Sequence, residues 1–184
     1  MLNSVNLETI AREIRVCTLC PLCKQRKLAV PGEGHKDSQI MLIGEAPGSE
    51  EDTQGRPFVG RAGQRLDMIL QRAAIDRSSL FITNVVKCRP PHNRVPHKQE
   101  IEICVAAHLQ RQLQIIQPKV VCLLGTTALK TLLNISRIAD VRGKVIKRDW
   151  IFLPTYHPAA VVRNPSLEKA VVKDFRKLIG QLEK

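Results

Sequence analysis

The sequence predicts an α/β fold, a three-layer α/β/α domain around a central, mainly parallel, four-stranded sheet. Four short apolar runs rich in β-branched residues indicate buried strands, and helical patterns separate them. The runs lack strict alternation, as expected of parallel strands covered on both faces. Because no repeat, low-complexity tract or linker interrupts the 184 residues, residues 1–184 are expected to form a single domain.

The expected strands are, in chain order, Gln39–Ala46, Phe81–Val86, Val120–Gly125 and Trp150–Thr155. Apolar stripes at helical spacing predict helices over residues 66–73, 101–116 and 171–182. Shorter helices are expected over Leu7–Val16 with Asn6 as its cap, over Thr126–Leu133 with Thr126 or Thr127 as its cap, and after Pro158. Val141–Ile146 is expected to add a short edge strand or hairpin arm that turns through Gly143.

The charge balance favours a nucleic-acid partner. Lysine and arginine number 29 against 17 acids, a net charge of +12 that attracts polyanions, although a basic surface can also simply aid solubility. Aromatic residues make up only 3% of the chain, which disfavours a base-stacking platform. No apolar run approaches the roughly 18 residues of a membrane helix, and no secretory signal is evident, so we expect a cytoplasmic, nucleoid-associated protein.

The stretch Gly44–Gly63 directly follows the first expected strand and indicates a pocket. It holds five glycines, two prolines, four acidic residues and one aromatic, Phe58, whose setting suggests exposure. Glycine is used where the backbone turns sharply or lets a ligand come close. The carboxyl ends of buried strands are where α/β proteins bind their ligands.

The cysteines indicate a metal or cluster site, since cytosolic thiols are kept reduced. The segment Cys17-Thr-Leu-Cys20-Pro-Leu-Cys23 contains two overlapping C-x-x-C pairs, and Cys88 and Cys104 follow later. This spacing is compatible with zinc and with an iron–sulfur cluster, and it favours a structural over a redox role. Cys122 lies within an apolar strand and is expected to be a packing residue.

Two further polar residues fall at strand ends. Asn84 interrupts an apolar run, so its amide either binds neighbouring backbone or reads a planar ligand. His157 ends the fourth strand, at what should be the same edge, and there it could donate a hydrogen bond to developing negative charge. The basic residues after Asn84 are expected to contact phosphates: Lys87, Arg89 and Arg94.

Taken together, these motifs resemble those of family 4 uracil-DNA glycosylases. The resemblance is carried by Gly44–Gly48, Gly55–Gly60, Ile82–Asn84, Lys87–Pro91, His157-Pro158 and the four-cysteine pattern Cys17, Cys20, Cys88 and Cys104. It covers nearly the whole chain and implies a monofunctional, monomeric enzyme that flips uracil out of single- or double-stranded DNA. Hydrolysis of the N-glycosidic bond would leave an abasic site for base excision repair. It also implies a [4Fe–4S] cluster on those four cysteines, with Cys23 as the competitor of Cys20.

The resemblance also implies roles for single residues. Phe58 stacks on the flipped base, Asn84 reads its polar edge and His157 hydrogen-bonds uracil O2 as the base departs. Glu45 is the candidate to polarise the attacking water, although family 1 enzymes use an aspartate at the next position, here Ala46. The remaining implied residues shape the pocket or contact DNA: Gly48, Glu51 and Asn93 near the base, Val161 as the wedge that fills the gap, and Arg163, Lys169 and Lys173 at phosphates.

Two other classes of protein share some of these sequence features. One is a catalytically silent iron–sulfur nucleic-acid-binding protein of the same fold, such as a polymerase-associated domain, against which the retained Phe58, Asn84 and His157 argue. The other is a nucleotide-binding α/β enzyme. Its phosphate loop would need G-x-x-x-x-G-K-[ST] or G-x-G-x-x-G, which the glycine-rich stretch lacks.

Overall fold

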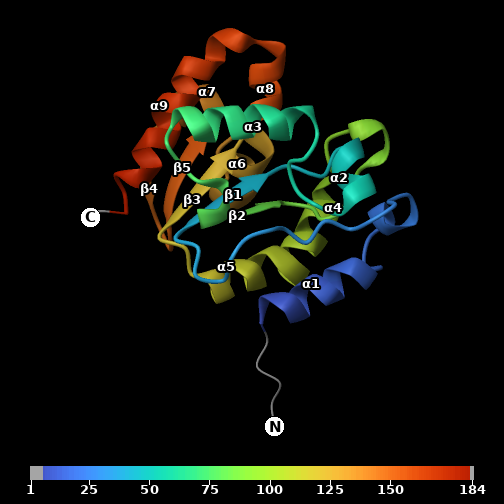
Figure 1. Cartoon of the computed structure of the whole chain (residues 1–184). Helices are drawn as coiled ribbons and strands as arrows, with labels where there is room; N and C mark the ends of the chain where they lie inside the picture. Colours follow the sequence, from blue (N-terminus) through green and yellow to red (C-terminus); the bar gives the residue numbers. More distant parts are fainter. Residues whose placement is uncertain (1–5, 183–184) are drawn as a thin grey trace.

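The computed structural model describes residues 6–182, in which a five-stranded sheet has the order β2-β1-β3-β5-β4 (Figure 1). Parallel pairing joins four of the strands, β1 (Ile40–Gly44), β2 (Leu80–Asn84), β3 (Val120–Leu124) and β5 (Ile151–Thr155). The fifth, β4 (Ile146–Lys147), pairs antiparallel with β5. The expected three-layer α/β/α fold with a mainly parallel sheet is confirmed, and the expected count of four strands was one short.

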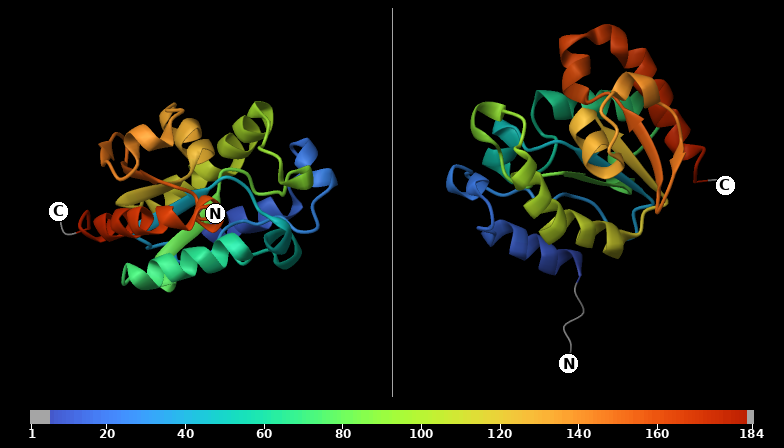
Figure 2. Two further views of the ribbon diagram at one scale, coloured as in Figure 1. Left: turned by 90° about the horizontal axis from the view of Figure 1, so that it is seen from above. Right: turned by 180° about the vertical axis from the view of Figure 1, so that it is seen from behind.

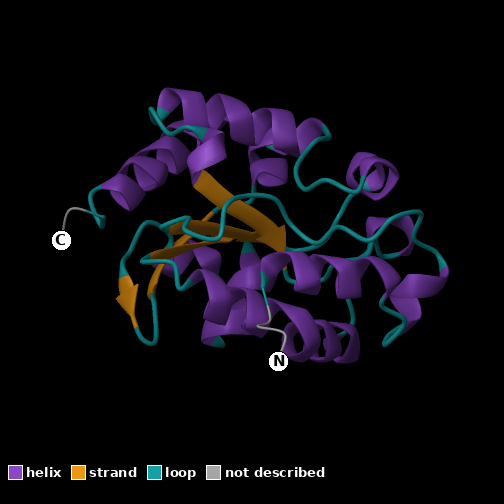
Figure 3. Cartoon of the chain, turned by 60° about the horizontal axis from the view of Figure 1, so that its bottom comes forward, coloured by secondary structure: helices purple, strands orange, loops and turns teal. Residues whose placement is uncertain are grey.

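Helices cover both faces of the sheet (Figures 1 and 2). One layer consists of α3 (Arg61–Arg72), α8 (Pro158–Arg163) and α9 (Glu168–Ile179). The other consists of α1 (Leu7–Val16), α4 (Lys98–Cys104), α5 (Gln110–Ile116) and α6 (Thr126–Leu133). Figure 3 shows the strands enclosed between the helices. Two short helices, α2 (Ser49–Gln54) and α7 (Ile138–Val141), lie outside these layers in the sequence connections that follow β1 and α6.

The central strands are mainly apolar because each face of the sheet has its own core. In β1, Ile40 and Leu42 pack with the α3, α8 and α9 layer, whereas Met41 and Ile43 pack with the opposite layer. All residues of β1, β2 and β3 are buried. The absence of alternation in the sequence therefore reflects burial on both sides.

Several local expectations hold and others need correction. The cap of α1 is confirmed, because the Asn6 side chain accepts a hydrogen bond of 2.9 Å from the Thr9 N–H. The bounds of α6 are confirmed, but its N-cap is Gly125, with φ of 89°, and no threonine side chain caps it. The expected edge arm over Val141–Ile146 was wrong in extent, because Val141 ends α7 and pairing begins only at Ile146.

Short irregular helices complete the chain. The predicted single helix over residues 101–116 is interrupted by a π-helical segment, Val105–Leu109, between α4 and α5. Single 3-10 turns lie at Pro21–Lys24, Arg77–Ser79, Pro91–Asn93 and Pro165–Leu167. Every helix within residues 6–182 is too short or too polar to cross a membrane.

Gly63 tests how closely α3 approaches the loop before it. A Cβ added at Gly63 would lie 1.9 Å from the Phe58 carbonyl oxygen, so Gly63→Ala forces the helix and the loop apart. We expect a loss of about 2 kcal/mol in the free energy of unfolding, measured by urea titration. The matched control is Gly180→Ala, where the nearest atom is 3.7 Å away and stability should not fall. Equal stabilities of the two variants would contradict this packing.

Candidate active site

The candidate site lies at the carboxyl ends of the parallel strands. Gly44 at the end of β1 is in register with Asn84 at the end of β2, and β5 ends at Thr155, two residues before His157. Three segments far apart in the sequence therefore deliver their polar residues to one edge, as the sequence predicted. This edge is the usual binding position in open α/β sheets.

The Phe58 ring packs into a space that only glycine leaves open. Its centroid is 5.6 Å from that of the His157 ring, with the planes tilted by 31°. A Cβ added at Gly44 would lie 2.7 Å from the Phe58 ring and 2.4 Å from Asn84 Oδ1. The expectation that Phe58 is exposed was wrong, since only 5% of it is accessible and its backbone has a φ of 52°.

Asn84 carries an unused acceptor. The residue is 2% exposed, and its side-chain oxygen is buried without a hydrogen-bond partner in the part of the chain that the structure describes. Leaving such an atom unpaired costs about 1–3 kcal/mol, so it is expected to have a ligand partner. The alternative, an amide oxygen satisfied by neighbouring backbone, is not observed.

His157 is held as a neutral hydrogen-bond donor. Its Nδ1 caps α8 by accepting the Ala159 N–H at 3.1 Å, which assigns the ring proton to Nε2. Burial and, to a smaller extent, the charge of Arg163 lower the pKa of His157 to about 4, and Glu51 opposes both. The imidazole is therefore uncharged near neutral pH and can donate from Nε2.

Glu45 follows β1 and keeps part of its side chain accessible. One carboxylate oxygen accepts a hydrogen bond from the Thr127 hydroxyl at the start of α6. Ala46 and Gly48, which complete the predicted loop, are also only partly buried. The second carboxylate oxygen of Glu45 has no hydrogen bond with any described residue, so it can accept one from water.

Glu51 fastens the loop from two sides. One of its carboxylate oxygens accepts the Gly48 N–H at 3.1 Å, and the other accepts the N–H groups of Val59 at 2.9 Å and Gly60 at 2.8 Å. The side chain is 8% exposed. Glu51 therefore fixes the backbone on either side of Phe58, in line with the supporting role expected of it.

The residues expected to contact DNA separate into exposed and buried groups. Asn93 is exposed and accepts a hydrogen bond of 2.8 Å from Arg89 Nε, and among the described residues its side chain has no hydrogen bond with Asn84 or His157. Arg163 is also exposed. Val161 is fully buried in the core with α3 and α9, so its predicted role as a DNA wedge is not supported.

Two of the expected phosphate contacts are also corrected. Arg94 forms a forked ion pair with Glu100, with hydrogen bonds of 2.8 Å and 2.7 Å. Lys87 is 1% exposed and donates to three protein acceptors. Neither cation is free for DNA, whereas Lys169 and Lys173 remain exposed.

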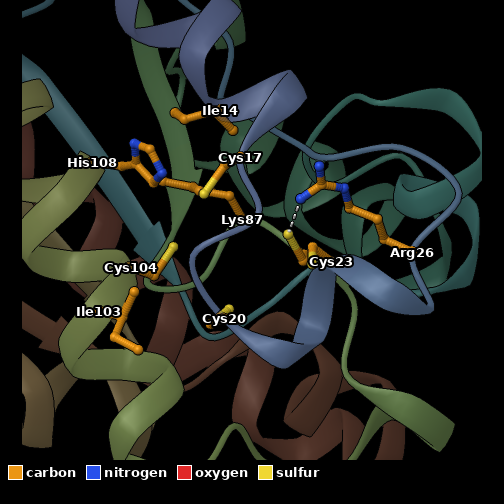
Figure 4. Close-up of a pocket in the computed structure, with 10 residues that line it drawn as sticks. Ile14, Cys17, Cys20, Cys23, Arg26, Lys87, Ile103, Cys104 and His108 are labelled. Carbon is orange, nitrogen blue, oxygen red and sulfur yellow. Dashed lines mark hydrogen bonds between the residues drawn. The ribbon is translucent and has the colours of Figure 1, made fainter.

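A second site is a cavity lined by five cysteines (Figure 4). The thiols come from the segment after α1 (Cys17, Cys20 and Cys23), from the segment after β2 (Cys88) and from α4 (Cys104). Three basic residues also line the cavity: Arg26, Lys87 and His108. Arg26 donates a hydrogen bond of 2.9 Å to the Cys88 sulfur. Cys122 lies outside the cavity, fully buried in β3, as expected of a packing residue.

The thiols face one another unequally. Burial raises the pKa of Cys88, and the neighbouring Cys20 and Cys17 raise it further. Burial raises the pKa of Cys104 to about 11, which Lys87 opposes and Cys88 and Cys20 reinforce. Cys20 and Cys23 both line the cavity, so the choice of Cys20 as the ligand stays a prediction.

The spacing of the thiols bears on the kind of group they could hold. Among the described residues, no three cysteine, histidine or carboxylate side chains converge closely enough for a single metal ion. Zinc would require sulfurs at about 2.3 Å from one centre. Thiols that line one cavity without converging fit a larger inorganic group that bridges them.

Comparisons with known proteins agree with this geometry. Residues 31–181 match the model of the uracil DNA glycosylase superfamily. A type-4 uracil-DNA glycosylase of Sulfurisphaera tokodaii is 46% identical, over 94% of this chain and 83% of the relative. One from Thermotoga maritima is 41% identical, over 97% of this chain and 95% of the relative. A DNA polymerase of Bacillus phage SP01 is 29% identical, over 83% of this chain but 17% of the polymerase.

The carboxylate of Glu51 provides a test of the loop. Glu51→Gln replaces one acceptor oxygen by an NH₂ group that faces a backbone N–H, so at least one hydrogen bond is lost and two donors oppose each other. We expect the free energy of unfolding to fall by about 2 kcal/mol in a urea titration. Glu50→Gln is the control on the same helix, because Glu50 is exposed. Equal losses in both variants would contradict the role assigned to Glu51.

Proposed function

The chain belongs to the uracil DNA glycosylase superfamily, and from this premise we propose that it excises uracil from DNA. The reaction is hydrolysis of the N-glycosidic bond of deoxyuridine, which leaves an abasic site for base excision repair. The names of the type-4 relatives support this activity. The observation that carries the proposal is the unpartnered Asn84 oxygen, buried near the Phe58 ring, which itself packs against the neutral His157.

Base recognition follows from the unused Asn84 amide. Uracil offers an N3–H donor and an O4 acceptor, which a fixed amide oxygen and NH₂ group can satisfy together. Cytosine offers an unprotonated N3 and an amino group, so the same amide would face acceptor against acceptor. An unpaired buried group is a strong discriminator. Phe58, packed at the same edge, supplies the ring face against which the flipped base stacks.

Leaving-group stabilisation is assigned to His157. As the glycosidic bond breaks, negative charge develops on the uracil ring, partly on O2. The neutral imidazole already carries a proton on Nε2, so it can donate a hydrogen bond to that oxygen without first becoming positively charged. Because Nδ1 is tied to the Ala159 N–H, the ring is already oriented for this donation.

Water activation is assigned to Glu45. Thr127 holds one carboxylate oxygen, which leaves the other to accept a hydrogen bond from the attacking water. Ala46 stands where family 1 enzymes carry an aspartate, so the contribution of a general base is expected to be smaller than that of leaving-group stabilisation. Glu51 and Gly48 hold the loop that presents Glu45.

DNA binding is assigned to exposed cations beside the site. Arg163 ends α8, which His157 caps, and Lys169 and Lys173 lie on α9. Their exposed side chains can neutralise backbone phosphates, so affinity should weaken as salt rises. The DNA is proposed to be single- or double-stranded and the enzyme monomeric.

The cysteine-lined cavity is proposed to hold a [4Fe–4S] cluster on Cys17, Cys20, Cys88 and Cys104. The residues fit this group, because their thiols surround one cavity without converging on a single-ion centre. When bound, the cluster would cross-link the segment after α1 to β2 and α4 and so stabilise the fold. No step of the proposed reaction involves it.

A catalytically silent DNA-binding protein of the same fold is the second candidate, and the partial match to a phage DNA polymerase keeps it in view. Such a protein would not need a buried acceptor at Asn84 or a neutral His157. Both features are present, which favours the enzyme.

The activity is tested with a uracil-containing oligonucleotide and a thymine-containing control, with alkali used to cleave abasic sites. Wild-type protein should break only the uracil strand. His157→Asn keeps a side-chain cap for the Ala159 N–H but removes the Nε2 donor, so kcat should fall about 10²–10³-fold. The control is His35→Asn, at an exposed histidine. If the wild-type protein breaks no strand, the proposed function is overturned. If His157→Asn keeps the wild-type kcat, the role assigned to this histidine is overturned.

The cofactor is tested by two cysteine variants. Cys20→Ser should lose iron and brown colour, whereas Cys23→Ser should retain both, because Cys20 and not Cys23 is proposed as the ligand. Iron per protein and the visible absorbance spectrum are the measurements. The reverse result would exchange the two ligands, and a colourless wild-type protein that contains zinc would contradict the cluster.

A further inference from the structure

Lys87 lines the cysteine cavity and also bonds the backbone of Asn84 in the candidate active site. Its side chain is among the largest that are fully buried. The ammonium donates to Thr83 Oγ1 at 2.6 Å, to the Asn84 backbone oxygen at 2.8 Å and to Gln112 Oε1 at 2.7 Å. Three short bonds to acceptors match the three protons of an ammonium. Burial lowers the pKa of Lys87 to about 7, and the neighbouring Cys104 and Cys88 oppose that shift.

None of these three acceptors carries a charge. Among the described residues, Lys87 has no ion pair with a carboxylate within 4.0 Å. A buried ammonium without an anion is costly, so a negative charge is expected nearby. The nearest candidates line the cysteine cavity, of which Lys87 forms part of the wall (Figure 4).

The same ammonium reaches the base pocket. Its bond to the Asn84 carbonyl fixes the backbone of the residue whose side chain carries the unpartnered acceptor. The other two partners are themselves anchored, since Thr83 Oγ1 and Gln112 Nε2 both donate to the Pro31 carbonyl, at 3.1 Å and 2.8 Å. The network thus ties β2 to α5 and to the segment before β1.

We propose that Lys87 is a positioning residue that couples the cysteine-lined cavity to Asn84. The anionic cysteine ligands with their bound cluster stabilise the buried ammonium, and the ammonium holds the Asn84 backbone in the position that reads uracil. This inference rests on the proposed function for the identity of the base and of the cluster. It predicts that the charge on Lys87 is felt at both sites.

The test uses the iron-loaded protein and two lysine variants. Lys87→Met removes the buried charge, whereas Lys24→Met removes an exposed charge one residue from Cys23. Loss of a nearby buried cation should lower the cluster's reduction potential in Lys87→Met, and solvent screening should leave it unchanged in Lys24→Met. Binding of free uracil, measured by calorimetry, should weaken about tenfold in Lys87→Met alone.

A second variant guards against misfolding. Lys87→Met combined with Gln112→Leu removes the ammonium and one of its acceptors together, which limits the number of unpaired buried groups. It should show the same fall in potential. A Lys87→Met protein that folds, by circular dichroism, but carries no iron would be the extreme form of the expected result.

The outcomes separate the inference from the proposed function. Reduction potential and iron content do not depend on glycosylase activity, which the oligonucleotide assay of the wild type measures by itself. An unchanged reduction potential in both Lys87→Met and the double variant Lys87→Met/Gln112→Leu would overturn the electrostatic link to the cavity. Unchanged uracil binding would overturn the link to Asn84.

Discussion

The candidate site depends on one carboxylate, that of Glu51, which holds in place a loop with little regular secondary structure. Between β1 and α3 the chain has only the short helix α2, so few backbone hydrogen bonds hold it in place. The Glu51 side chain accepts three further hydrogen bonds from backbone N–H groups, from Gly48 on one side and from Val59 and Gly60 on the other. Phe58 lies next to this second attachment. A hydrogen bond of 2.8 Å from Arg77 to the Pro57 carbonyl adds to this attachment, so both neighbours of Phe58 in the sequence are held.

The site concentrates features that cost stability. Phe58 has a φ of 52°, Gly44 lacks a side chain where the ring needs space, and the Asn84 oxygen is buried unpaired. Each is unfavourable for folding alone, and all three lie together at the carboxyl ends of β1 and β2. Strain and unsatisfied groups gather at functional sites because a ligand, not the fold, completes them.

The sequence predicted what local pattern and strand order determine. Apolar runs placed β1, β2, β3 and β5, and strand polarity then placed Asn84 and His157 at one edge. It could not show which way a side chain turns after its strand ends. Phe58 was therefore expected to be exposed, and Val161 and Lys87 were expected at DNA, although all three are buried. Composition indicates a cation, but only tertiary structure shows whether protein acceptors already surround it.

The five residues from Asn84 to Cys88 connect the candidate active site to the cysteine-lined cavity. At one end of the segment the Asn84 amide has an unpartnered oxygen, and at the other Cys88 lines the cysteine cavity. Lys87 lies between them and folds back to bond the Asn84 carbonyl. A rigid amide must be held from behind, and a buried ammonium can do this only where an anion offsets its charge. In this chain, the cysteine-lined cavity is where that anion can reside.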